Sequence, residues 1–259
     1  MGFFNKIKKE KSKDEKVEKT IERISIFDTD YPIDKSNWFQ VFSACLGQVI
    51  AIQEACAEQV VKNQNWNVDF RLGTLTFGKD VYPMQFIGSE ANSNQSWLWA
   101  WENINGFDQR ILQVAHELKA IGEEWNLEPL MIPRFKLDDT FNGHNLSIVA
   151  CGILKNHYCY YRGPHDHGAV FMAFSDVPET VFAPVNAEKF ASIVIDCIQN
   201  YHIDHQIFVE SFLMWNNTKY DWQDQQIVAH FSTDIIIVFE QVHEFMRISS
   251  IKNIKPEIS

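Results

Sequence analysis

The stretch Ser-Trp-Leu-Trp-Ala-Trp-Glu-Asn, residues 96–103, is the most individual feature of the chain and the starting point for its fold. Successive side chains of a β-strand point to opposite faces, so a strand here would carry Trp97, Trp99 and Trp101 on one face. The two residues between these tryptophans are also apolar. Apolar residues on both faces are typical of a central strand, and the stretch therefore predicts a strand that is covered on both sides.

The segments before and after the tryptophan strand predict a helix, three antiparallel strands and a second helix. Apolar residues recur at helical spacing over 38–60 and over 111–125. Residues 67–77 alternate between polar and apolar, but the alternation slips at Gly73, which indicates a bulge or a bend. A turn at 78–80 leads into the next strand, and the tryptophan strand follows as the third.

The second half of the chain predicts elements of the same kinds. A short apolar helix is expected near residues 146–154, strands at 158–162 and 169–174, and helices that Asn186 and Asp204 cap. Three apolar stretches between residues 225 and 251 predict a closing β-meander. The expected fold class is therefore α+β, with antiparallel β-meanders packed against amphipathic helices.

The domain organisation follows from composition. Residues 1–30 are rich in Lys and Glu and predict a charged flexible tail. Residues 31–259 predict a single α+β globular domain, with two sub-units at 31–128 and 140–259 as the alternative. A chain of 259 residues with 46% hydrophobic residues has enough apolar material for either arrangement.

The charge is divided unevenly along the chain. Residues 1–25 carry eight basic and five acidic side chains, a net charge of +3, whereas the rest carries 15 basic and 29 acidic side chains, a net charge of −14. A phosphate backbone would repel such an acidic body, so no nucleic acid is expected as a partner, and a basic protein partner would be attracted.

The expected location is the cytoplasm, because no apolar run approaches the roughly 20 residues of a membrane span and no signal peptide opens the chain. The five cysteines are scattered among apolar residues, which predicts buried, reduced thiols. Phe3, Phe4 and Ile7 beside several lysines predict at most a weak peripheral contact of the tail with a membrane.

Two groups of residues are candidate sites. The tryptophan strand could be a stacking floor for a ligand, although core packing is the simpler interpretation. His165 and His167 flank Asp166 in a loop and could bind one metal ion, although solvated histidines in a polar turn are the default and a third ligand would have to come from 202–205. The acidic pair Asp138-Asp139 is interpreted as solvated rather than catalytic.

Signatures of established chemistry are absent from the sequence. It contains neither a nucleophile elbow nor a phosphate-binding loop nor a dinucleotide-binding glycine pattern. Neither Cys151 nor Cys159 stands at a strand-to-helix junction typical of a nucleophile. No catalytic residue and no cofactor are therefore predicted.

Several motifs resemble an uncharacterised bacterial family of unknown function. They are LGTLTFG at 72–78, QFIG at 85–88, SWLWAWEN at 96–103 and YRGP at 161–164. The resemblance covers roughly residues 36–250 and implies a shared fold without assigned chemistry. Tyr161 and Arg162, which begin the last motif, join the three tryptophans as candidate ligand-binding residues.

Two hypotheses for function follow. The first is a non-enzymatic binding or interaction protein with an acidic surface, in its most concrete form an inhibitor or immunity protein for a basic toxin. The second is a small metal-dependent enzyme or ligand sensor that uses the loop of His165 and His167. The sequence leaves the partner, the substrate and the oligomeric state open.

Overall fold

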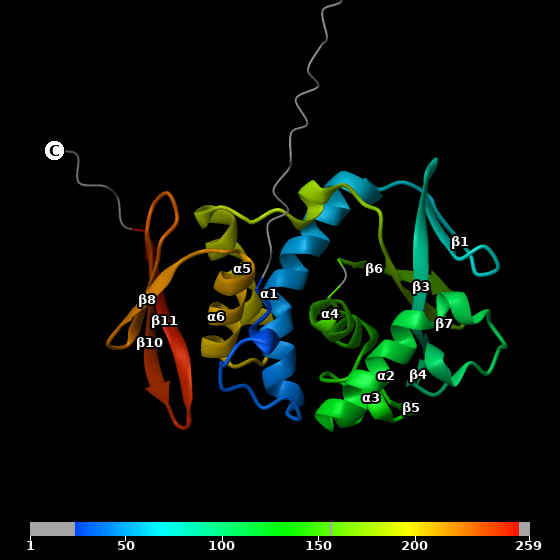
Figure 1. The fold of residues 1–259 in the computed structure, drawn as a ribbon, viewed down its shortest axis with the longest axis horizontal. Helices are drawn as coiled ribbons and strands as arrows, with labels where there is room; N and C mark the ends of the chain where they lie inside the picture. Colours follow the sequence, from blue (N-terminus) through cyan, green and yellow to red (C-terminus); the bar gives the residue numbers. More distant parts are fainter. Residues whose placement is uncertain (1–23, 156, 254–259) are drawn as a thin grey trace, which may run out of the picture.

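The computed structural model describes residues 24–155 and 157–253, in which two antiparallel sheets flank a layer of helices (Figure 1). The larger sheet lies on the right of Figure 1 and the smaller one on the left, with α1, α4, α5 and α6 between them. This arrangement confirms the predicted α+β class with antiparallel sheets packed against helices. The predicted membrane contact of the tail falls on residues 1–23, outside the described part of the chain.

Helix α1 (Trp38–Cys56) is the centre of the helical layer. It begins where the Asn37 side chain accepts hydrogen bonds from the next turn, as an N-cap does. It packs against the other three helices, which are α4 (Gly143–Ile153), α5 (Ala187–Asn200) and α6 (His205–Trp215). Buried on several sides, α1 lacks the polar face of a surface helix.

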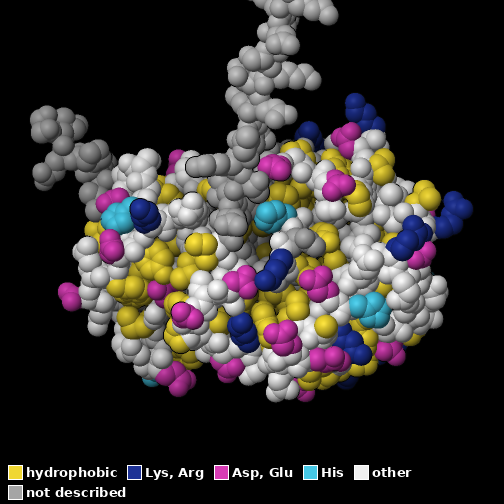
Figure 2. Space-filling view, in the orientation of Figure 1, with side chains coloured by type: hydrophobic (Ala, Val, Ile, Leu, Met, Phe, Trp, Pro, Cys, Tyr) yellow, Lys and Arg dark blue, Asp and Glu magenta, His cyan; other side chains and the backbone are white. Residues whose placement is uncertain are grey.

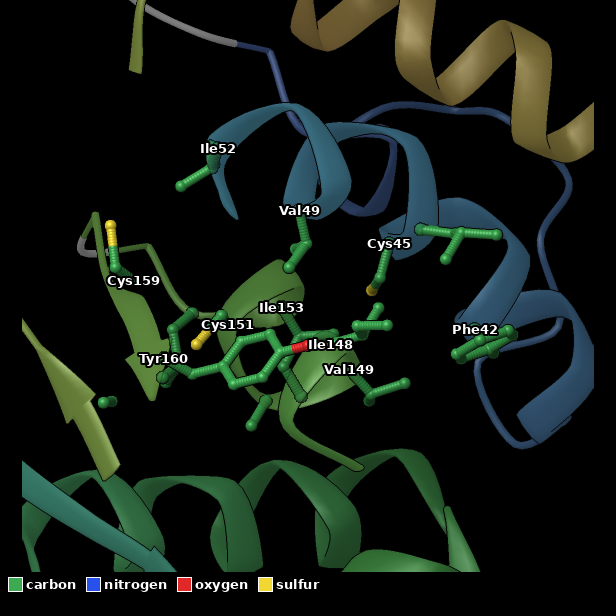
Figure 3. Close-up of a cluster of buried hydrophobic side chains, with 14 of the residues drawn as sticks. Phe42, Cys45, Val49, Ile52, Ile148, Val149, Cys151, Ile153, Cys159 and Tyr160 are labelled. Atoms are coloured by element: carbon green, nitrogen blue, oxygen red, sulfur yellow. The ribbon is translucent and has the colours of Figure 1, made fainter. Parts of the chain in front are cut away.

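The contact between α1 and α4 shows how tightly this layer is packed. Figure 3 shows Cys45 and Val49 of α1 pointing toward the apolar side chains of α4. A Cβ atom at Gly152 would lie 2.5 Å from Cβ of Cys45, so only a glycine lets the two helices approach this closely. All five cysteines are buried and free, and burial raises the pKa of Cys197 to about 12, which keeps that thiol protonated.

The segment Trp38–Val61, which is α1 and the π-turn that follows it, is long and apolar enough to cross a membrane. Within the described residues it is the one helix that passes this test. However, 61% of its apolar window is buried inside the protein, and the apolar composition is what a central core helix requires.

The larger sheet is organised around one long strand, β3 (Asp80–Ala91), which pairs first with β2 and then with β4 and β7. Its other strands are β1 (Trp66–Asp69), β2 (Thr74–Phe77), β4 (Ser96–Trp99), β5 (Arg134–Lys136), β6 (Cys159–His165) and β7 (Gly168–Phe174). The order β1-β2-β3-β4-β5 is extended by β7 beside β3 and by β6 beside β7. The two halves of the chain therefore share one sheet.

Two details of this sheet differ from the sequence prediction. The slip at Gly73 is not a bulge within one strand, because the chain reverses there and β1 pairs with β2 as a hairpin. The tryptophan strand is shorter than predicted. It ends at Trp99, and residues 100–102 form a 3-10 turn that closes at Asn103 with φ of +46°. Trp101 is therefore not part of the strand.

The helices α2 (Gln113–Trp125) and α3 (Glu128–Met131) accompany the larger sheet, and α2 packs against β3 as the helical spacing predicted. Three further 3-10 turns lie in the described residues: η4 (Gln109–Ile111) contacts β3, η1 (Ile26–Asp28) contacts α6, and η5 (Glu179–Phe182) contacts α1. In η1, Ile26 and Phe27 are buried, so the packed protein begins before residue 31.

The smaller sheet is the closing meander that the last apolar stretches predicted. Its strands are β8 (Tyr220–Gln223), β9 (Gln226–Ala229), β10 (Ile235–Val242) and β11 (Phe245–Asn253), in the order β11-β10-β9-β8. Ile235, Ile237 and Phe239 of β10 alternate on the buried face. These side chains belong to the same contiguous hydrophobic core as those of the larger sheet, and the structure does not separate into two cores.

Candidate functional site

The tryptophan strand belongs to the core. Trp97 and Trp99 have no exposed surface, and their rings meet edge to face with centroids 5.2 Å apart. Trp97 also packs against Phe171 of β7. Neither ring offers a face on which a ligand could stack in this conformation. Trp101 is half-buried outside the strand, where Nζ of Lys119 lies 4.7 Å from its ring.

Tyr161 and Arg162 point to opposite faces of β6, because they are neighbours in a strand. The ring of Tyr161 packs between other aromatic rings, 4.9 Å from that of Phe77. Arg162 lies with Nε 3.7 Å from Oε2 of Glu90, whose Oε1 accepts a hydrogen bond from the N–H of Gly143. Glu90 thus satisfies the N-terminus of α4, and Arg162 balances its charge.

His165 and His167 lie in the β6–β7 hairpin, as predicted. Nδ1 of His165 accepts a hydrogen bond from the backbone N–H of His167, and the ring centroids are 6.4 Å apart. Over the described ranges no group of three His, Cys, Asp or Glu residues is placed to hold a metal ion. His205, one of the residues expected to supply a third ligand, instead accepts at Nδ1 a hydrogen bond from the N–H of Ile248. The metal site stays a prediction.

A groove of about 1030 Å³ opens elsewhere, where the N-terminal ends of α1 and α4 meet the C-terminal end of α5. Its aromatic wall consists of Trp38, Phe39, Phe42 and Tyr201. Trp38 and Phe42 are one helical turn apart in α1, and their rings lie nearly parallel with centroids 6.3 Å apart. The ring of Tyr201, which follows α5, lies 5.9 Å from that of Phe42.

Beside the aromatic wall, the rim of the groove is an acidic loop, residues 138–141, which a buried amide holds in place. Oδ1 of Asp138 accepts hydrogen bonds from the N–H groups of Thr140 and Phe141, at 2.8 and 2.6 Å. Nδ2 of Asn145, a residue 8% exposed, donates to the carbonyl oxygens of Asp139 and Thr140. The loop is therefore rigidly shaped, and the side chains of Asp138 and Asp139 are exposed at the groove.

Two histidines complete the lining. Nδ1 of His144 lies 3.4 Å from the hydroxyl oxygen of Tyr160. Desolvation lowers the pKa of His144, and the charge of Arg162 lowers it further against the opposing effect of Glu90, so this imidazole is neutral at pH 7. The ring of His202 packs against that of Phe39. Among the described residues that line the groove there is no Lys or Arg.

No local signal in the sequence could have found this groove. Its residues come from three segments, 38–42, 138–145 and 200–202, that are about one hundred and about sixty residues apart. The acidic pair at 138–139 is exposed, as expected, but solvated acidic pairs are common, and the neighbouring aromatic wall comes from other parts of the chain.

Fold and groove together define a two-sheet α+β protein with a groove lined by aromatic and acidic residues. The chain belongs to the family of unknown function DUF6882, whose family model matches residues 40–177. No curated protein and no solved structure matches the chain. The match is narrower than the expected 36–250. It runs from α1 to the residues just after β7, so that α5, α6 and the smaller sheet lie beyond it.

The groove lies at the border of the family match. Phe42 and the acidic loop 138–141 lie within it, whereas Trp38, Phe39 and Tyr201 lie outside. The family segment therefore supplies the acidic rim, and the flanking segments supply most of the aromatic wall.

Proposed function

We propose that this chain is a non-enzymatic bacterial protein of the cytoplasm that binds a basic protein partner in the groove between α1, α4 and α5. Its most concrete form is an inhibitor or immunity protein for a basic toxin. One observation carries the proposal: aromatic side chains and an acidic loop line the same groove, and its described lining contains no cationic residue. Aromatic faces and carboxylates are the two surfaces that attract cationic side chains.

The charge of the whole protein favours the same partner. Beyond residue 25 the chain carries a net charge of −14, which steers a basic protein toward it. On the face seen in Figure 2, the acidic side chains are spread over the surface rather than gathered in one patch. Net charge alone therefore does not single out one surface, whereas the aromatic wall supports the groove as the proposed binding site.

The size of the groove is sufficient for part of a protein partner. Pockets for small ligands usually measure about 300 to 1,000 Å³, and the groove, at about 1030 Å³, lies at the upper limit of that range. It has room for several side chains of a protein segment.

The metal-dependent alternative has less support, because His165 and His167 have no third ligand among the described residues. We therefore prefer the binding protein.

The test is isothermal titration of the full chain with an arginine- and lysine-rich peptide and with a glutamate-rich peptide of the same length. We expect micromolar binding of the basic peptide only, weakened about tenfold between roughly 50 and 300 mM salt because the attraction is screened. The double variant Asp138→Asn/Asp139→Asn should lose most of this binding. Its matched control, Glu123→Gln/Glu124→Gln, removes an adjacent exposed pair outside the groove and should bind normally. An equal loss of peptide binding in both double variants would contradict the proposal.

A further inference from the structure

The strongest unexplained feature of the groove is the place where its two walls meet. The ring centroid of Trp38 lies 5.3 Å from that of Phe141. The N–H of Phe141 is in turn bonded to Oδ1 of Asp138, in the same tight loop that carries Asp139. An indole and two exposed carboxylates are therefore brought together by one connecting residue, although they come from segments about one hundred residues apart.

We propose that this corner is an arginine pocket, an inference that rests on the proposed function. One arginine side chain of the basic partner stacks on Trp38 and pairs with the carboxylates of Asp138 and Asp139. A guanidinium is planar, so it can lie against an indole and at the same time donate parallel N–H bonds to a carboxylate. An ammonium group is a compact, strongly hydrated point charge and satisfies only part of this arrangement.

The surroundings of the corner favour a cation and hold the carboxylates ready for it. His144, the titratable residue of α4 in the groove lining, is neutral at pH 7 for the reasons given above. His202 lies across the groove, where its ring packs on Phe39. The amide of Asn145 fixes the backbone of the acidic loop before any partner arrives, so little ordering entropy is lost on binding.

A second property of the corner is that the indole of Trp38 is held in place by neighbouring rings. The rings of Trp38 and Phe42 are nearly parallel, at 15°, so the indole is held from one side by its own helix. Held in this way, Trp38 can act as a rigid stacking surface that needs no rearrangement. Rigid aromatic anchors of this kind dominate binding energies where they are desolvated by a partner.

The test compares three peptides that differ at a single position, which holds arginine, lysine or citrulline, by titration against the full chain. Citrulline has the shape of arginine without its charge. We expect the arginine peptide to bind at least about tenfold more tightly than the lysine peptide, and the citrulline peptide to bind more weakly still. The variant Trp38→Leu should lose the preference for arginine over lysine, while circular dichroism shows an unchanged helix content.

The outcomes separate this inference from the proposed function. The arginine and lysine peptides could bind equally tightly and both lose binding in Asp138→Asn/Asp139→Asn. That result would overturn the arginine pocket but would agree with a basic partner. Citrulline binding as tightly as arginine would also overturn it. If none of the three peptides binds at low salt, both proposals fall.

Discussion

A Cβ atom at Gly88 would lie 2.3 Å from Cζ2 of Trp97, so the backbone of β3 and the indole of β4 are in direct contact. The contact lies beside an irregularity in the pairing of β3 with β7, between Phe86 and Gly88. Gly88 and Trp97 belong to the second and third motifs of the resemblance noted in the sequence. Their link is physical, because the absent side chain of one makes room for the large side chain of the other.

Gly88→Ala should therefore destabilise the protein. The added methyl group cannot fit unless Trp97 or the strand shifts, and overpacking of this kind costs about 1–3 kcal/mol of unfolding free energy. Urea unfolding followed by tryptophan fluorescence measures it. Ser89→Ala, at the next position on the opposite face of β3, is the control and should change the free energy by less than about 0.5 kcal/mol. Equal effects would contradict the contact.

The two buried tryptophans should differ in their tolerance of phenylalanine. Nε1 of Trp99 donates a hydrogen bond to the carbonyl oxygen of Pro129, whereas Nε1 of Trp97 is buried without a partner. Trp99→Phe loses volume and leaves a carbonyl unsatisfied, but Trp97→Phe loses volume and relieves an unsatisfied donor. We expect Trp99→Phe to lower the unfolding free energy, measured in urea, by about 1–3 kcal/mol more than Trp97→Phe does. A smaller cost for Trp99→Phe than for Trp97→Phe would refute this.

His205 should make the stability depend on pH. Its Nδ1 accepts a hydrogen bond from the N–H of Ile248, and burial with the charge of Arg247 lowers its pKa from 6.5 to about 4. Because the pKa is lower in the folded state, this contribution is complete above pH 6.5 and is lost as the pH falls toward 4. The loss should be about 1–3 kcal/mol in urea titrations at several pH values.

The control for this pH dependence is His205→Asn, which keeps an acceptor near the position of Nδ1 but does not titrate. Its stability should be flatter than that of the parent protein between pH 6.5 and 4. An equally steep loss in the variant would show that other groups cause it.

Glu210 is a buried carboxylate that joins three parts of the chain. It is 5% exposed and accepts hydrogen bonds from Tyr31, Gln206, Tyr220 and Trp222. Burial and the carboxylate of Glu210 raise the pKa of Tyr31 and of Tyr220. Glu210→Gln replaces one accepting oxygen with an NH2 group, which then faces hydrogen-bond donors. This should lower the unfolding free energy by about 2–3 kcal/mol. Tyr31→Phe removes one hydrogen bond and should lower the unfolding free energy by about 1 kcal/mol. Urea unfolding of both variants measures the two losses.

Local patterns predicted most of the helices and strands because each pattern reports on its own segment. The helical spacing of 111–125 anticipated α2, and Asn186 and Asp204 cap α5 and α6 as expected. The same reasoning failed at Trp101, where the apolar alternation continues but the strand does not. The pairing of β4 with β5 ends at Leu98 and its pairing with β3 ends at Trp99, and residues 100–102 then form a 3-10 turn.

The sequence by itself determined the fold class, the acidic charge of the body and the places where most elements begin, because periodicity, caps and charge are properties of short segments. Only the tertiary structure decided that Trp97 and Trp99 are core, and that Trp38, Asp138 and Tyr201 face one groove. The physical reason is that packing α1 against α4 and α5 brings together segments that are far apart along the chain, and no local pattern records which distant segments will meet.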